Sequence, residues 1–133
     1  MADFFLDTDT ASRLMRADRS TVNAMRKSGA SSISVSTVTR SELLYGALIR
    51  PDKPALMSAV HAFLARVAIH SWDRAAADSH AAVRAKAKQD GRSAGTFDLM
   101  IAAHAHALDA TLVTGDNAIR NLKIEGLKVV TWG

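Results

Sequence analysis

Short apolar runs rich in β-branched residues alternate along the chain with longer segments of helical period, and this alternation restricts the possible folds most strongly. The predicted strands cover residues 3–6, 32–36, 67–71, 111–114 and 127–131. The predicted helices cover residues 10–16, 20–28, 40–49, 55–66, 73–89 and 97–108. Because parallel strands need long crossover connections, we predict an α/β fold. Helices should cover both faces of a central parallel sheet of about five strands, in three layers (α/β/α).

The size and composition of the chain are those of one globular domain. Its 133 residues, 48% of them hydrophobic, suffice for one core, so we predict a single domain over residues 1–133. The absence of cysteine excludes a disulfide framework, a Cys-ligated zinc site and a cysteine nucleophile. The start MADFFLDTDT lacks a basic region, and no apolar stretch is long enough to span a membrane. We therefore expect a cytoplasmic protein without a membrane partner.

The charges of the chain favour a polyanionic partner such as nucleic acid. Lysine and arginine number 17 against 13 aspartates and glutamates, which gives a net charge of +4. The cations are dispersed, however, and form no basic arm. Four of the acids stand against apolar runs, where an unpaired carboxylate is costly: Asp7, Glu42, Asp98 and Asp116.

The predicted fold brings these four acids to one edge of the sheet. Asp7 and Asp116 directly follow predicted strands, Glu42 follows the second strand by a few residues, and Asp98 begins the last predicted helix. Open α/β sheets bind ligands beyond the carboxyl ends of their strands. Like charges gathered there repel one another unless a cation lies between them. A ligand set of oxygens alone suits Mg²⁺, or Mn²⁺, and such an ion can activate water for phosphodiester cleavage.

Each acid also has a structural interpretation. Thr39 and Glu42 match a capping box, and Thr96 is positioned to cap the helix that contains Asp98. Asp7 and Asp116 suit turns or helix caps, the latter in the turn-like stretch GDN.

Three further residues are weaker candidates for the same site: Thr8, Asp9 and Thr114. Thr114, at a strand end, could hydrogen-bond a site carboxylate or a metal-bound water, although threonine is also common in strands. Asp9 or Thr10 could instead simply cap the following helix.

At these residues the sequence resembles the PIN-domain ribonucleases, most closely the VapC-type toxins of toxin–antitoxin pairs. The similar stretches are FFLDTDT, STVTRSELLYG, GRSAGTFDLMIAAHAHAL, ATLVTGDN and LKVVTW, in family order across nearly the whole chain. One departure is Asp9, where the family commonly has asparagine after LDT.

The resemblance implies a PIN-like α/β/α fold and an endoribonuclease that cleaves structured RNA, such as tRNA or ribosomal RNA. It implies catalysis by Asp7, Glu42, Asp98 and Asp116, with Mg²⁺ (or Mn²⁺) held by Asp7, Asp98 and Asp116. It further implies a homodimer and a cognate VapB-type antitoxin that blocks the site in a higher-order complex. Operator DNA would be bound only through that antitoxin.

Two other functions stay open on the sequence alone. FFLDTDT also fits the Asp-x-Asp-x-Thr pattern of haloacid-dehalogenase-like phosphatases, with Asp7 as nucleophile and Asp9 as acid and base. That pattern leaves Glu42 and Asp98 without a role. The third possibility is a non-catalytic basic interaction module whose acids only cap helices.

Overall fold

The strands of this computed structural model form one parallel sheet. The structure describes residues 3–133, so Met1 and Ala2 of the predicted domain lie outside it. The strands are β1 (Asp3–Leu6), β2 (Ser32–Ser36), β3 (Ala68–His70), β4 (Thr111–Val113) and β5 (Lys128–Val130). They lie in the order β3-β2-β1-β4-β5, and every neighbouring pair is parallel. The predicted five-stranded parallel sheet is confirmed.

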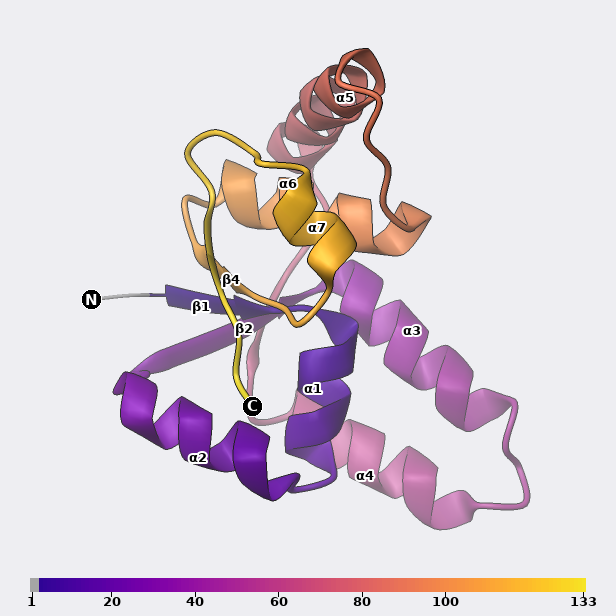
Figure 1. The fold of residues 1–133 in the computed structure, drawn as a ribbon. Helices are drawn as coiled ribbons and strands as arrows, with labels where there is room; N and C mark the ends of the chain where they lie inside the picture. Colours follow the sequence, from indigo (N-terminus) through magenta and orange to yellow (C-terminus); the bar gives the residue numbers. More distant parts are fainter. Residues whose placement is uncertain (1–2) are drawn as a thin grey trace.

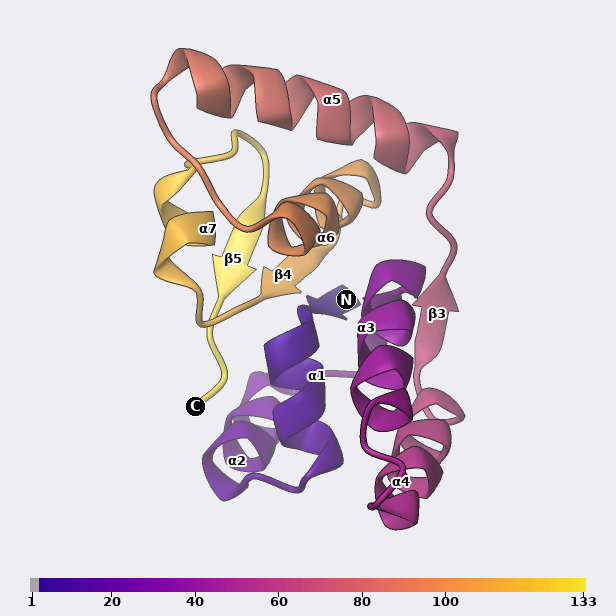
Figure 2. The ribbon, with the colours of Figure 1, turned by 90° about the vertical axis from the view of Figure 1, so that its right-hand side faces the viewer.

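Helices cover both faces of the sheet, as the prediction required. They are α1 (Thr8–Met15), α2 (Arg19–Ser28), α3 (Thr37–Leu48), α4 (Pro54–Leu64), α5 (Arg74–Gln89), α6 (Thr96–Ala107) and α7 (Asn117–Asn121). Figures 1 and 2 show α5, α6 and α7 on one side, with α1, α2 and α4 on the other and α3 beside them. The result is the predicted three-layer α/β/α arrangement. Within residues 3–133 no helix is long and apolar enough to cross a membrane.

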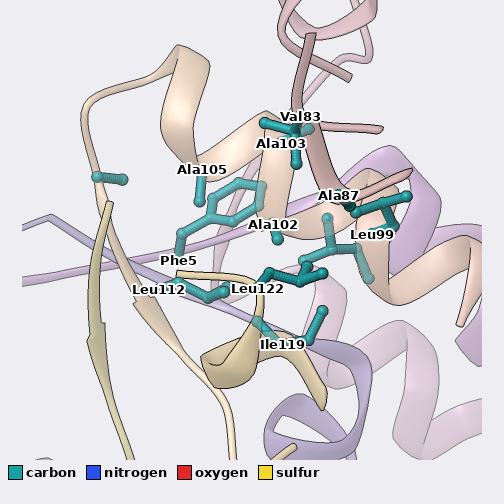
Figure 3. Close-up of a cluster of buried hydrophobic side chains, with 12 residues drawn as sticks. Phe5, Val83, Ala87, Leu99, Ala102, Ala103, Ala105, Leu112, Ile119 and Leu122 are labelled. Atoms are coloured by element: carbon teal, nitrogen blue, oxygen red, sulfur yellow. The ribbon is translucent and has the colours of Figure 1, made fainter. Parts of the chain in front are cut away.

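The alternation of side chains along β1 divides the core in two. Phe4 and Leu6 belong to the cluster packed under α1, α3 and α4. Phe5 points to the opposite face, as a strand of period two requires, and joins the cluster formed with α5, α6 and α7. Figure 3 shows Phe5 among alanines of α6, with Leu112 of β4 and Ile119 of α7 closing the cluster. The small alanines let α6 pack closely against the sheet.

Several helices begin earlier than the sequence indicated, because a residue at the strand end is the N-cap. Asp7, not Asp9 or Thr10, caps α1, and Ser36 caps α3 by accepting from the Val38 amide at 3.0 Å. The capping box of Thr39 and Glu42 is therefore wrong, since Thr39 lies inside the helix.

Two further helices, α6 and α7, also differ from the sequence prediction. Gly95, not Thr96, is the N-cap of α6. Helix α7 was not predicted, because a helix of five residues is too short to show a periodic apolar pattern.

The register of the parallel strands brings their carboxyl ends together. Leu6 pairs with Val113 and Val113 with Val130, so β1, β4 and β5 end side by side. On the other flank, Phe5 pairs with Ser34 of β2, two residues before that strand ends at Ser36. The residues that follow β1, β2 and β4 consequently emerge at one edge of the sheet.

Replacing Phe5 by alanine tests this packing. Phe5 has 0% exposure on the central strand, so Phe5→Ala should lower the free energy of unfolding by about 3–5 kcal/mol. Denaturant titration followed by circular dichroism measures the loss. The matched control is Phe97→Ala, because Phe97 is 54% exposed and its loss should cost about 0.5 kcal/mol. Equal losses in the two variants would contradict the described core.

Candidate active site

Asp7 is held between two neighbouring elements at the edge of the sheet. It follows β1, is buried, and caps α1 by accepting a 2.8 Å hydrogen bond from the Thr10 amide at Oδ1. Its Oδ2 accepts a 2.5 Å hydrogen bond from the hydroxyl of Thr114, which follows β4. The interpretation of Asp7 as a cap is therefore correct. The carboxylate nevertheless remains at the edge where ligands of parallel sheets bind.

Thr114 links Asp7 to Asp116. Its fully buried hydroxyl donates to Asp7 and accepts from the Asp116 amide at 3.0 Å. Asp116 then caps α7 through a 2.8 Å hydrogen bond from the Ala118 amide to its Oδ1. The prediction that Thr114 hydrogen-bonds a site carboxylate is thus correct.

Glu42 reaches the same region from α3. Its Oε1 accepts a 2.5 Å hydrogen bond from the hydroxyl of Thr8, in the first turn of α1. Thr8 Oγ1 also lies 3.0 Å from Thr39 Oγ1. A threonine hydroxyl has one proton, so Thr8 donates to Glu42 and accepts from buried Thr39. Thr8 and Thr39 therefore fix one oxygen of Glu42.

Asp98 is half-buried in the first turn of α6, and its surroundings disfavour its charge. Burial and a hydrogen-bonding contact with Asp116 raise its pKa from 3.8 to about 6. The negative charges of Asp116, Asp7 and Glu42 raise the pKa further in the same direction. Each of the three other acids is thus close enough to Asp98 to act on it electrostatically, and the predicted convergence of the four acids is present in the structure.

Gly95 is a site residue that the sequence reasoning missed. A Cβ at this N-cap would lie 3.2 Å from Oδ2 of Asp98, tighter than ordinary van der Waals contact. Glycine therefore leaves room for the Asp98 carboxylate. Only the position of Gly95, three residues before an acid at a helix start, could have signalled this. Thr39, which contacts Thr8 and through it helps to hold Glu42, was predicted only as a possible helix cap.

Asp9 does not join the four acids. Its side chain is 64% exposed and pairs with Arg13 Nε at 3.2 Å along the surface of α1. An exposed pair of this kind contributes little to stability. Asp9 does line the edge of a groove of about 520 Å³ between α1, α3 and α4, which Glu42 and Asp98 also reach. The rest of that groove is mixed: polar Thr8, Ser12 and Arg16 line it together with the apolar side chains of Met15, Leu43, Ala47, Leu56 and Val60.

None of the four acids forms an ion pair with a basic side chain in the described part of the chain. The ion pairs within residues 3–133 engage Asp9, Asp52 and Asp90, and none engages Asp7, Glu42, Asp98 or Asp116. An all-oxygen set with excess negative charge suits a hard divalent cation. In the described chain no three of these side chains already form a metal-binding group. The donors fit Mg²⁺ by chemistry, and their side chains would have to shift to complete the coordination.

The substitution Asp98→Asn tests, without any metal, whether the fold raises the pKa of Asp98. The pKa of Asp98, about 6 in the fold, exceeds its ordinary 3.8, so the folded protein binds this proton more tightly than the unfolded chain does. The stability that Asp98 contributes is therefore fully present below about pH 4 and is lost as the pH rises through 6.

An asparagine side chain cannot ionise, so the stability advantage of Asp98→Asn over the parent protein should grow between pH 4 and pH 7. After allowance for solvent screening we expect a gain on the order of 1 kcal/mol. Urea unfolding in EDTA at several pH values measures it. If the difference in the free energy of unfolding between the two proteins does not change with pH, the pKa of Asp98 is not raised in the fold.

Comparisons with known proteins identify the family of this fold. A family model described as "PIN domain" matches residues 4–125. The chain is 29% identical over 132 residues to "tRNA(fMet)-specific endonuclease VapC" of Shigella flexneri, covering 99% of both proteins. It is 34% identical over 101 residues to "Ribonuclease VapC2" of Rickettsia felis, covering 75% of this chain and 74% of that protein.

Solved structures give the same result. A chain of the DNA-bound VapBC complex from Salmonella typhimurium aligns over 100% of both chains with a TM-score of 0.88 and 26% identity. A chain of VapBC2 from Rickettsia felis, bound to a promoter DNA fragment, aligns over 98% of both chains with a TM-score of 0.86 and 26% identity. On the family match, the full-length likeness and the shared architecture, this chain belongs to the PIN domain family and, within it, to the VapC group.

Proposed function

We propose that the chain is the ribonuclease toxin of a VapBC-type toxin–antitoxin pair and cleaves structured RNA, such as tRNA or ribosomal RNA, with Mg²⁺ or Mn²⁺. The observation that carries the proposal is the convergence of Asp7, Glu42 and Asp116 on Asp98, without a basic side chain to balance them. Relatives named as endonuclease and ribonuclease support the same reaction class. A single PIN domain over residues 1–133 would suffice for this activity.

Asp7, Asp98 and Asp116 would hold the metal. A divalent cation bound by carboxylates lowers the pKa of a water molecule and stabilises negative charge on a phosphoryl group. Thr114 keeps one oxygen of Asp7 fixed while it positions the amide of Asp116, so the two carboxylates are oriented as a unit. The raised pKa of Asp98 is the expected property of a carboxyl group whose charge a bound cation would stabilise.

Glu42 would orient the attacking water. Its Oε1 is occupied by Thr8, whereas no residue of the described chain bonds to its Oε2. That oxygen can therefore accept a hydrogen bond from water aligned with an RNA phosphate. In-line attack of the water oxygen would break the bond between phosphorus and the 3′ oxygen, leaving a 5′ phosphate and a 3′ hydroxyl.

The antitoxin would cover this site. Similar solved structures are VapBC complexes, two of them bound to DNA. Glu42 and Asp98 line the groove between α1, α3 and α4, so a protein segment lying in it would reach the acids. By family analogy the toxin would act as a homodimer, and the antitoxin would carry the contacts to operator DNA.

The two alternative functions are not supported. The phosphatase interpretation is wrong, because the chain belongs to the PIN family and Asp9 is exposed and paired with Arg13. The interpretation as a module without catalysis leaves the unbalanced carboxylates unexplained, although they do cap α1 and α7.

Substitutions of the acids test the reaction. Asp7→Asn and Glu42→Gln remove a proposed metal ligand and the proposed water-orienting group, so each should lower RNA cleavage by a factor of about 100 or more. Incubation with total RNA, with Mg²⁺ or with EDTA, followed by mapping of the cleaved ends, measures this. The control is Asp52→Asn, which removes an exposed acid paired with Arg50 and should keep full activity.

Three results would contradict the proposal. They are cleavage that continues in EDTA, cleavage retained by Asp7→Asn and Glu42→Gln, or an equal loss in Asp52→Asn. Circular dichroism of each variant separates a chemical effect from unfolding.

A further inference from the structure

The long helix α5 carries a basic stripe that runs into the loop before α6. Four residues recur at intervals of four along one face of α5 and into the following loop: His80, Arg84, Lys88 and Arg92. Residues four apart lie on the same side of a helix, about 6 Å apart along its axis. This spacing is comparable to that of successive phosphates in a nucleic acid strand.

The exposed cations of this stripe have no acidic partner. Arg84 and Lys88 are exposed, and neither makes a hydrogen bond or an ion pair within residues 3–133. On another face of the same helix, Lys86 pairs with Asp90 at 3.3 Å. Of the four lysines and arginines of α5, Lys86 is neutralised and Arg74 begins the helix, while the two on the stripe are free to bind an external anion.

The stripe forms one wall of a groove of about 340 Å³. Arg92 closes one end, because its Nη1 donates a 2.6 Å hydrogen bond to the carbonyl of Asn121 at the end of α7. That bond fixes the loop between α5 and α6, which Figure 2 shows descending from the end of α5 to the start of α6. The groove is therefore a defined feature of the fold.

The groove includes part of the first turn of α6, the turn that also carries Asp98. Thr96 and Leu99 line it, whereas Asp98 lines the groove between α1, α3 and α4. Ser93, in the loop, contributes a hydroxyl to the lining of the groove. The small side chains of Ala87 and Ala94 also line it. A chain of phosphates lying along α5 would consequently reach the turn of α6 that carries Asp98.

The two grooves beside the acids differ in chemistry. The charged side chains that line the groove between α1, α3 and α4 are three acids and Arg16, whereas those that line the α5 groove are all basic. Phosphate contacts of this kind position a nucleic acid without reading its sequence.

We propose that the α5 groove binds the sugar-phosphate backbone of the RNA substrate and delivers it to Asp98. The inference rests on the proposed ribonuclease function and adds the surface that holds the substrate.

Removal of the two free cations tests the groove. Arg84→Ala/Lys88→Ala should bind a fluorescein-labelled RNA hairpin about tenfold more weakly in EDTA, where no cleavage occurs. The slope of log affinity against log salt should become shallower by about 1.4 to 1.8, since each lost phosphate contact contributes roughly 0.7 to 0.9. With Mg²⁺ the KM for the hairpin should rise while kcat at saturating RNA is retained.

The matched control is Arg26→Ala/Lys27→Ala. It removes the same charge from exposed positions on α2, on the other side of the sheet, and should leave binding and the salt slope unchanged. The exchange Arg84→Lys/Lys88→Arg keeps the charge and should bind like the parent. Thermal melting of every variant identifies loss of fold. Arg84 and Lys88 make no side-chain hydrogen bonds or ion pairs in the described chain, so we expect no change in Tm.

Each remaining outcome decides the proposal. If the two alanine double variants bind RNA equally, or if the α5 variant loses the antitoxin but keeps RNA, the groove is not the RNA site. If the parent binds the hairpin in EDTA and the α5 variant binds it more weakly, yet neither cleaves RNA with Mg²⁺, the groove stands and the proposed nuclease function fails.

Discussion

The hydrogen bond from Thr114 to Asp7 joins the ends of two central strands, and the arrangement of the acids depends on it. It turns one carboxylate oxygen toward β4 while the Thr10 amide holds the other, and the same hydroxyl positions Asp116. The fold thereby brings negative charges together, and they add to burial, the largest cause, in raising the pKa of Asp98. A protein with net charge +4 thus contains a small region of opposite sign, with the basic groove of α5 beside it.

The sequence was sufficient for the architecture and for the principal acids, for definite physical reasons. Apolar β-branched runs separated by helical segments admit few arrangements besides a parallel sheet, and such a sheet gathers whatever follows its strands. The convergence of Asp7 and Asp116 followed from this rule alone. Glu42, a few residues after the second strand, and Asp98, at a helix start, were expected at the same edge, and both fall in stretches that resemble the family.

The details that orient the acids were not predictable, because they depend on contacts between distant segments. Thr8 and Glu42 are 34 residues apart, and Thr114 and Asp7 are 107 apart, so no local pattern connects them. Gly95 acts through the space that it leaves for Asp98. The basic stripe of α5 is visible in the sequence as residues at intervals of four. The sequence does not show, however, that these residues line a groove beside α6.

The most direct test of the central claim is a crystal structure with Mn²⁺, located by its anomalous scattering. The account predicts a peak coordinated by oxygens of Asp7, Asp98 and Asp116, with the side chain of Asp98 ionised and Thr114 still bonded to Asp7. A second peak beside Glu42 would add a second ion without altering this assignment. Absence of any peak among these residues at saturating Mn²⁺, or a peak only at exposed Asp9, would contradict it.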